Sequence, residues 1–335
     1  MRNVIYRIQG EVPDYVDHIK GYKGILAADE SAPTIEKRLA SVGVDSTEGS
    51  RHSYRYNLFS TKGLENYIGG VILFDETIRS ERTIKPLLEK GICIGIKVDK
   101  GAKPYDEIGG MLTEGLDGLT ERLREYRNLG AEFAKWRAVI AVDDTDACII
   151  ANAWTLARYA KRCQDEGIVP IVEPEVLMNG AHHIIDSMLF TEKVLHHVFD
   201  AMYYERVELE AMILKPNMIL NGYESNSPLP QFHDTARTLD DSEIVAHYTT
   251  DCFRRCVPAA VPMIAFLSGG QADGVAVKNL NQINKHSFPW YATFSFGREL
   301  QQNSLKLWAN GQLEDAKQTL LSRARECSQA SAGDL

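Results

Sequence analysis

The sequence lacks any long apolar run. Nowhere do 18 hydrophobic residues follow one another, which excludes a membrane-spanning helix. Residues 1–10 mix arginine with polar side chains and lack the apolar core of a secretory signal. An excess of positive charge is also absent, because the formal net charge is −9, so general attraction to nucleic acid or anionic lipid is not expected. We therefore expect a cytoplasmic protein with neither nucleic-acid nor membrane partners.

Cysteine is sparse and carries no metal-binding pattern. The 6 cysteines are scattered and none belongs to a Cys-x-x-Cys pair, so we expect ordinary reduced thiols. Two histidine pairs, at 182–183 and 196–197, are the other candidate ligands. Neighbours in sequence point apart on a helix or a strand, and no carboxylate–histidine motif frames either pair. We expect no metal and no cofactor.

What the chain does contain is a regular series of short apolar runs, within a composition of 44% hydrophobic and 25% charged residues that is typical of ordered proteins. The eight runs are 24–29, 69–74, 92–100, 133–140, 168–175, 211–218, 263–271 and 292–298. Helical or long polar stretches separate them, as a (β/α)8 TIM barrel requires. We predict one domain over residues 1–335, with an irregular tail at about 328–335. A doubly wound open sheet is the competing architecture.

Residues that can carry chemistry fall at or just past the ends of these runs. They are Asp29, Lys97, Lys135, Glu173, Lys215, Ser268 and Arg298. In a barrel the carboxyl ends of all strands converge on one mouth. An open sheet would gather only the residues near its switch point, so this distribution favours the barrel.

Lys215 is the most unusual of these residues, because the run 211–218 is apolar on both sides of it. Burying an ammonium costs several kcal/mol unless it is paired or made neutral, and the neutral amine attacks carbonyl groups. Charges on Lys97 and Lys135, if they lie nearby, would lower the pKa of Lys215. The alternative is that Lys215 lies past the strand end and extends its ammonium to water.

Further residues complete a possible imine mechanism. Glu173 and Asp29 are available to move protons as an imine forms and as a carbon–carbon bond breaks. Lys135 and Arg137 lie two apart on one strand and therefore share a face, which is compatible with one anionic site. The alternative for that strand is a charged, solvated edge.

A phosphate site is predicted late in the chain. Ser268-Gly269-Gly270 and Gly297-Arg298 end adjacent strands, where barrels often bind phosphate through backbone amides and a helix amino terminus. Arg298 would add a bidentate charge. A Ser-Gly-Gly sequence alone can also be simply a turn.

Taken in order, these blocks resemble the class I fructose-1,6-bisphosphate aldolases from about residue 14 to 310. The matching blocks are 24–31, 69–74 with 76–77, 95–101, 133–137, 169–175, 214–218, 267–271 and 293–298, with Phe296 where the animal enzymes usually have tyrosine. The resemblance implies reversible cleavage of fructose 1,6-bisphosphate in glycolysis and gluconeogenesis, without a metal, by a homotetramer.

The resemblance also implies roles for individual residues. Lys215 matches the imine-forming lysine and Glu173 the carboxylate that exchanges protons with the carbinolamine. Asp29 matches the aspartate of bond cleavage, and Lys135 a lysine that assists proton transfer. The cradle for the ketose phosphate corresponds to Ser268, Gly269, Gly270, Ser295, Gly297 and Arg298. Polar positions toward the substrate or its second phosphate correspond to Ser31, Arg38, Lys97 and Arg137.

Three departures from the family pattern stand out. Ala32-Pro33 replaces a Thr-Gly pair, which should stiffen the loop near the second phosphate. The loop 221–241 is longer than in the animal enzymes, and the chain ends at Leu335 without their terminal tyrosine. The alternatives to cleavage of the bisphosphate are an aldolase for another ketose phosphate, a binding or scaffold protein without turnover, and a metal-dependent barrel lyase.

Overall fold

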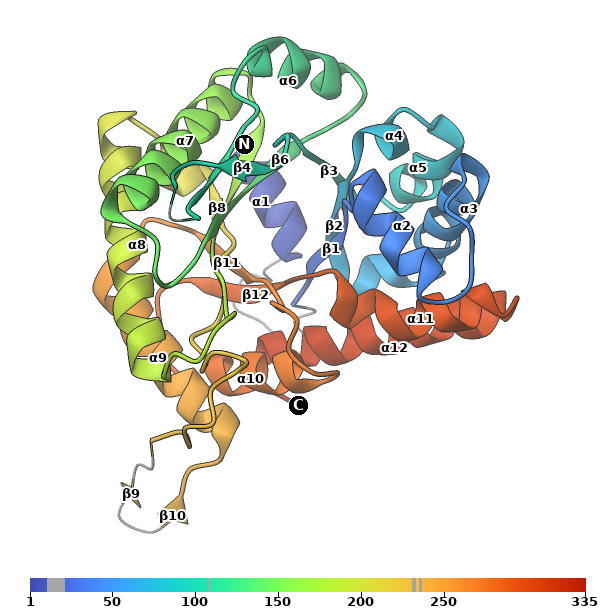
Figure 1. Cartoon of the computed structure of the whole chain (residues 1–335). Coiled ribbons are helices and arrows are strands. Elements are labelled where there is room, and N and C mark those ends of the chain that lie inside the picture. The colour runs from blue at the N-terminus through green and yellow to red at the C-terminus, as the bar shows by residue number, and fades with distance from the viewer. Residues whose placement is uncertain (11–21, 108, 231–232, 235–236) are drawn as a thin grey trace.

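The computed structural model describes residues 1–10, 22–107, 109–230, 233–234 and 237–335. The start of the family resemblance, near residue 14, and part of the loop 221–241 lie outside the described residues. Eight parallel strands close a barrel in the order β1, β12, β11, β8, β7, β6, β3, β2 (Figure 1). They are β1 (Gly24–Ala28), β2 (Ile68–Leu73), β3 (Cys93–Lys97), β6 (Phe133–Ile140), β7 (Val169–Val176), β8 (Ile213–Leu214), β11 (Met263–Phe266) and β12 (Tyr291–Phe296). All eight predicted strands are present, and the open-sheet alternative is wrong.

Helices connect the strands and surround the barrel (Figure 1). They are α1 (Arg2–Gln9), α2 (Ala32–Ala40), α3 (Glu48–Phe59), α4 (Asp75–Ile78), α5 (Glu81–Glu89), α6 (Leu119–Asn128), α7 (Asp146–Asp165), α8 (Ile184–Tyr204), α9 (Asp241–Cys256), α10 (Val275–Asn284), α11 (Arg298–Ala309) and α12 (Leu313–Ala332). Short 3-10 turns occupy Leu64–Asn66 and Leu209–Ala211. Among the described helices, none combines the length and apolar character needed to cross a bilayer.

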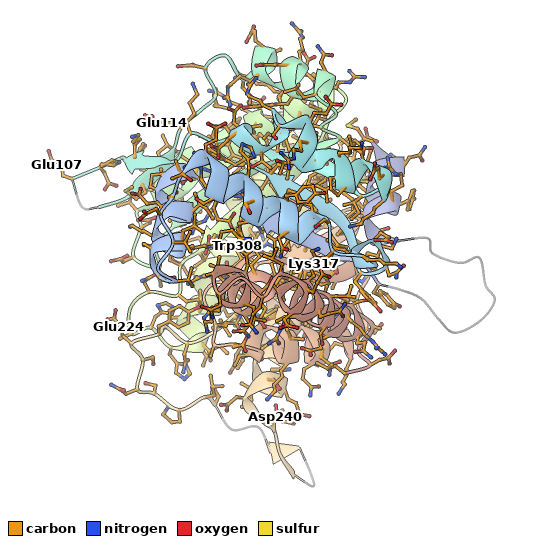
Figure 2. All side chains as sticks on the ribbon, turned by 90° about the vertical axis from the view of Figure 1, so that its right-hand side faces the viewer. Glu107, Glu114, Glu224, Asp240, Trp308 and Lys317 are labelled. Atoms are coloured by element: carbon orange, nitrogen blue, oxygen red, sulfur yellow. The ribbon has the colours of Figure 1, made fainter. Side chains whose placement is uncertain are left out.

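Two small antiparallel ladders lie outside the barrel. β4 (Ala102–Pro104) pairs with β5 (Met111–Thr113) after strand β3, and β9 (His233–Asp234) pairs with β10 (Arg237–Thr238) in the connection after β8. Figure 2 places Glu107, Glu114 and Glu224 on one side of the molecule, and all three follow the carboxyl ends of barrel strands. That side is the mouth of the barrel.

Alternation along the strands explains why charged groups collect at this mouth. Successive side chains of a strand point to opposite faces, so residues two apart share the barrel interior. Its lower part is apolar and includes Ala27, Phe133, Ile171 and Ile213, with Ile5 and Ile8 of helix α1 packed against it. Two positions further along the same four strands come Asp29, Lys135, Glu173 and Lys215.

The carboxyl terminus differs from the sequence prediction. The irregular tail expected at about 328–335 is wrong for residues 328–332, because helix α12 continues to Ala332 and ends at Gly333 in a left-handed conformation. Small residues let this helix pack closely on the barrel: the Ser331 hydroxyl lies 3.1 Å from that of Thr293 on strand β12. Backbone groups of Leu335 then exchange two hydrogen bonds with the Asn281 amide, at 3.0 and 3.1 Å.

Candidate active site

Lys215 follows the short strand β8 directly and points into the barrel. Its backbone N–H donates to the carbonyl of Val172 at 2.8 Å, which extends the pairing with β7 by one residue. Pro216 accepts from the N–H of Leu267 at 3.0 Å and so ties the end of β8 to the end of β11. Only 4% of Lys215 is exposed, so the expectation that it might extend its ammonium to water is wrong.

Two lysines and two carboxylates form a continuous chain of ion pairs. Glu173 Oε1 lies 3.2 Å from Lys215 Nζ, and its other oxygen, Oε2, lies 3.1 Å from Lys135 Nζ. Lys135 Nζ also lies 2.9 Å from Asp29 Oδ2. The side chains of Glu173, Lys135 and Lys215 are each 5% exposed, and that of Asp29 is 14% exposed. The solvated-edge alternative for the strand that carries Lys135 is therefore wrong.

Ion pairing keeps Asp29, Glu173 and Lys135 charged despite their burial. Burial would raise the pKa of the Asp29 carboxyl, but the ammonium groups of Lys135 and Lys215 outweigh it and hold that pKa well below its usual range. Burial would likewise raise the pKa of the Glu173 carboxyl, but the same two cations outweigh it, and this pKa is also lowered. For Lys135, burial alone would lower the pKa, yet Asp29 and Glu173 raise it. Glu173 is thus a carboxylate, able to accept a proton, in contact with the Lys215 amine.

Three more cations at the mouth each have a carboxylate partner: Lys97 with Asp99, Arg137 with Glu175, and Arg38 with Glu30. These three carboxylates were not among the predicted site residues. The sequence did contain a signal for two of them, since residues two apart on a strand share a face. Asp99 lies two positions after Lys97, and Glu175 lies two positions after Glu173. Each cation remains at the cavity wall with its position fixed by its partner.

The predicted anion cradle lies between the ends of β11 and β12. Gly269 and Gly270 both adopt left-handed conformations, with φ of +59° and +86°, and successive amides in such a turn form a concave anion site. Helix α11 begins at Arg298, and its amino terminus adds further N–H groups. A Cβ on Gly270 would lie 2.7 Å from Arg298 Nη2, so the guanidinium packs directly on this glycine. The buried Ser295 hydroxyl has no hydrogen-bond partner among the described residues and lines the same space.

One cavity of about 370 Å³ gathers these groups. Every predicted site residue except Gly270 lines it: Asp29, Ser31, Arg38, Lys97, Lys135, Arg137, Glu173, Lys215, Ser268, Gly269, Ser295, Gly297 and Arg298. Gly270 stands just outside, against Arg298. Two other hollows, of about 570 and 740 Å³, lack the lysine and carboxylate cluster. Among the described residues, no group of three or more histidine, cysteine or acidic side chains is placed to hold a metal ion.

These features define the class of protein: a (β/α)8 barrel whose mouth joins buried lysines and carboxylates to a glycine turn and an arginine. The profile of the family described as "Fructose-bisphosphate aldolase class-I" matches residues 16–335. The chain belongs to the class I fructose-bisphosphate aldolase family. It is accordingly a carbon–carbon lyase with a sugar phosphate as substrate.

Individual relatives agree with this assignment. A protein from Xylella fastidiosa named "Probable fructose-bisphosphate aldolase class 1" is 45% identical over 93% of this chain and 94% of its own length. "Fructose-bisphosphate aldolase 4, cytosolic" from Arabidopsis thaliana is 43% identical over 93% of this chain and 80% of its own length. Among solved structures, the aldolase of Plasmodium falciparum, in a complex with TRAP and a small-molecule inhibitor, superposes with a TM-score of 0.91. It is 40% identical and covers 99% of this chain and 94% of its own.

Proposed function

We propose that this protein cleaves fructose 1,6-bisphosphate reversibly to dihydroxyacetone phosphate and glyceraldehyde 3-phosphate through an imine on Lys215. The observation that carries the proposal is the contact between Lys215 Nζ and Glu173 Oε1, at 3.2 Å, inside a cavity that also contains the anion cradle. A buried amine beside a carboxylate is the arrangement that imine formation needs. The names of the relatives support the substrate. The description of the family as glycolytic supports a place in glycolysis, and the reversibility of the reaction extends the proposal to gluconeogenesis.

In the proposed reaction, Glu173 takes a proton from the Lys215 ammonium, and the neutral amine attacks the C2 carbonyl of the ketose. A proton passes from the attacking nitrogen to the new alkoxide, and Glu173 then returns its own proton to the resulting carbinolamine hydroxyl, which leaves as water and yields the protonated imine. Asp29 accepts the proton of the C4 hydroxyl as the C3–C4 bond breaks, and the bonding electrons pass into the enamine. Lys135 holds both carboxylates in place and lowers their pKa, through contacts of 2.9 and 3.1 Å.

The two phosphates take the two cationic ends of the cavity. The ketose phosphate binds the cradle formed by Ser268, Gly269, Gly270, Ser295, Gly297 and Arg298. The second phosphate lies toward Ser31, Arg38, Lys97 and Arg137. The cations come from a chain of net charge −9, so anion binding depends on this local grouping rather than on the overall field.

Borohydride reduction in the presence of dihydroxyacetone phosphate, followed by peptide mass analysis, tests the mechanism. We expect one adduct, on Lys215, and its absence from folded protein would exclude the imine. Comparing kcat/KM for fructose 1,6-bisphosphate and fructose 1-phosphate tests the second phosphate site, since no preference for the bisphosphate would favour another ketose phosphate. Full activity after treatment with a chelator is expected, and a loss would favour a metal-dependent lyase. Absence of any turnover would favour a scaffold.

We also propose that the chain acts as one domain, in a cytoplasmic homo-oligomer. The cytosolic name of the Arabidopsis thaliana relative supports the compartment. An exposed aromatic cluster, in which Trp154 of α7 stacks on Tyr204 of α8 beside Tyr203, supports self-association, because such patches often mark interfaces. Tyr203 is 79% exposed in the isolated chain. Light scattering after size-exclusion chromatography measures the state directly, and a tetramer is expected.

A further inference from the structure

Tyr223 connects the segment after β8 to the anion cradle after β11. Its phenolic hydroxyl donates a hydrogen bond to the carbonyl oxygen of Gly269, 46 positions further along the chain. The side chain is 50% exposed, so it does not belong to the packed core. Its hydrogen bond therefore joins two segments that follow the carboxyl ends of neighbouring barrel strands.

The backbone around Tyr223 is held from the opposite side. Tyr223 N–H donates to the carbonyl of Met178 at 2.8 Å, and the flanking N–H groups of Gly222 and Glu224 donate to His182 and Gly180 at 2.9 and 3.0 Å. The two segments pack so closely that a Cβ on Gly222 would lie 2.2 Å from the Gly180 carbonyl oxygen. The segment 222–224 is therefore fixed to the connection after β7, and the tyrosine ring extends from a rigid base.

The bond to Gly269 acts on the conformation that makes the cradle. Gly269 has φ of +59° and Gly270 of +86°, and glycine loses more backbone freedom on becoming ordered than any other residue. Fixing the Gly269 carbonyl restricts the peptide plane between the two glycines, and hence the direction of the Gly270 N–H. We propose that Tyr223 is a positioning residue, which orders the Gly269-Gly270 turn so that its amides and Arg298 meet the ketose phosphate together. This inference rests on the proposed function, because it assigns a supporting residue to the same phosphate site.

The surroundings of Tyr223 agree with a role as donor. Burial raises the pKa of its hydroxyl, Arg298 opposes the rise and Glu175 adds to it, and the balance lies above the usual value. The phenol therefore keeps its proton across the neutral range.

The substitution Tyr223→Phe removes only the hydroxyl, and Tyr6→Phe is the matched control on helix α1, where Tyr6 is 58% exposed. Since a single hydrogen bond contributes about 0.5–1.5 kcal/mol, we expect Tyr223→Phe to raise the KM of both ketose phosphates by about two- to tenfold. We expect kcat to stay within about twofold of the wild-type value, because no group that moves a proton is altered. In the condensation direction, half-saturation by dihydroxyacetone phosphate should shift by the same factor, and that by glyceraldehyde 3-phosphate should not.

The two trioses separate a positioning role from general loosening of the site. Equal shifts for both trioses, an unchanged KM, or a loss confined to kcat would each overturn the inference. Binding of inorganic phosphate gives a readout that needs no turnover. The relevant binding site is the one that Arg298→Ala abolishes, and Tyr223→Phe should weaken phosphate binding there by the same factor. If wild-type protein gives no adduct on Lys215, the imine mechanism fails, and this phosphate measurement still decides the role of Tyr223.

Discussion

Glu173 contacts two lysines at once, with Oε1 3.2 Å from Lys215 Nζ and Oε2 3.1 Å from Lys135 Nζ. One carboxylate thus links the proposed nucleophile to the cation that holds Asp29. A single proton carrier in contact with the amine can serve both the formation and the dehydration of the carbinolamine, whereas two separate groups would each have to lie within reach.

The substitution Glu173→Gln keeps the shape of this side chain and removes its ability to exchange a proton. We expect kcat to fall by about 10²- to 10⁴-fold, the usual contribution of a positioned acid or base. The rate at which borohydride traps the Lys215 adduct in a single turnover measures the step directly. Glu175→Gln is the control, because Glu175 pairs with Arg137, so it should change KM more than kcat. A Glu173→Gln enzyme within tenfold of wild type would exclude the proposed role.

The substitution Lys135→Met should change stability in a pH-dependent way. Removing one partner of a buried ion pair typically costs about 3–5 kcal/mol, and Lys135 is the partner of two carboxylates. In the wild type, the lowered pKa values of Asp29 and Glu173 stabilise the fold above the unfolded pKa values of about 4, and this contribution is lost as pH falls through the folded values. Without Lys135 the folded pKa values rise, so less is lost on acidification.

The deficit of Lys135→Met in the free energy of unfolding should therefore be full at pH 7 and shrink below about pH 4. Denaturant unfolding of both proteins at pH 7, 5 and 3.5 measures it. Lys85→Met is a suitable control, since Lys85 is exposed and pairs only loosely with Glu89, at 3.8 Å. A deficit of constant size across this pH range would show that the carboxylates do not depend on Lys135 for their ionisation.

The sequence predicted the barrel and the convergence of its charged residues because both follow from local patterns. Eight apolar runs identify the strands, and spacing by two places Lys135 and Arg137 on one face. The partner of each cation could not be predicted in the same way. In the strand register Arg137 lies beside Glu173, yet its ion pair is with Glu175, because the side chain extends toward the mouth. Such choices depend on three-dimensional register and on side-chain reach.

Two other features had no usable local signal. The sequence 328–332 contains Ser, Gln and Ala, which suggested an irregular tail, but small size is what lets α12 approach the barrel so closely that Ala330 is fully buried. Tyr223 lies in a polar stretch that was predicted only as a loop. Its bond to Gly269 joins positions 46 apart and exists only because the barrel brings the ends of β8 and β11 side by side.

The substitution Gly270→Ala should damage phosphate binding more than stability. Its Cβ would lie 2.7 Å from Arg298 Nη2, so the guanidinium has to move. The left-handed backbone at φ +86° adds a cost of about 1–2 kcal/mol for any residue with a Cβ. Gly311→Ala is the matched control, because Gly311 has φ +78° and nothing within 4 Å of the added carbon. Both variants should lose similar stability, and only Gly270→Ala should raise the KM for fructose 1,6-bisphosphate. Equal KM values in the two variants would contradict the placement of the cradle.

Removal of Gly333, Asp334 and Leu335 should leave cleavage nearly unchanged. Helix α10 follows the carboxyl end of β11, so its first residues lie beside the mouth of the barrel. Leu335 hydrogen-bonds to Asn281, which lies in the carboxyl half of this helix. In this position the terminus lies away from the cavity, and none of these three residues has a side chain that lines it. Truncation removes the two hydrogen bonds with Asn281 and two more that the N–H groups of Gly333 and Asp334 donate to Ala330 and Gln329, so the free energy of unfolding should fall by about 2–6 kcal/mol. Asn281→Ala removes only the two bonds with Leu335, leaves the terminus intact and should lower the free energy of unfolding by about 1–3 kcal/mol, less than the truncation does. Steady-state kcat and exchange of the enamine proton into solvent measure function. A tenfold fall in either for the truncated protein, but not for Asn281→Ala, would show that the terminus moves to the mouth during turnover.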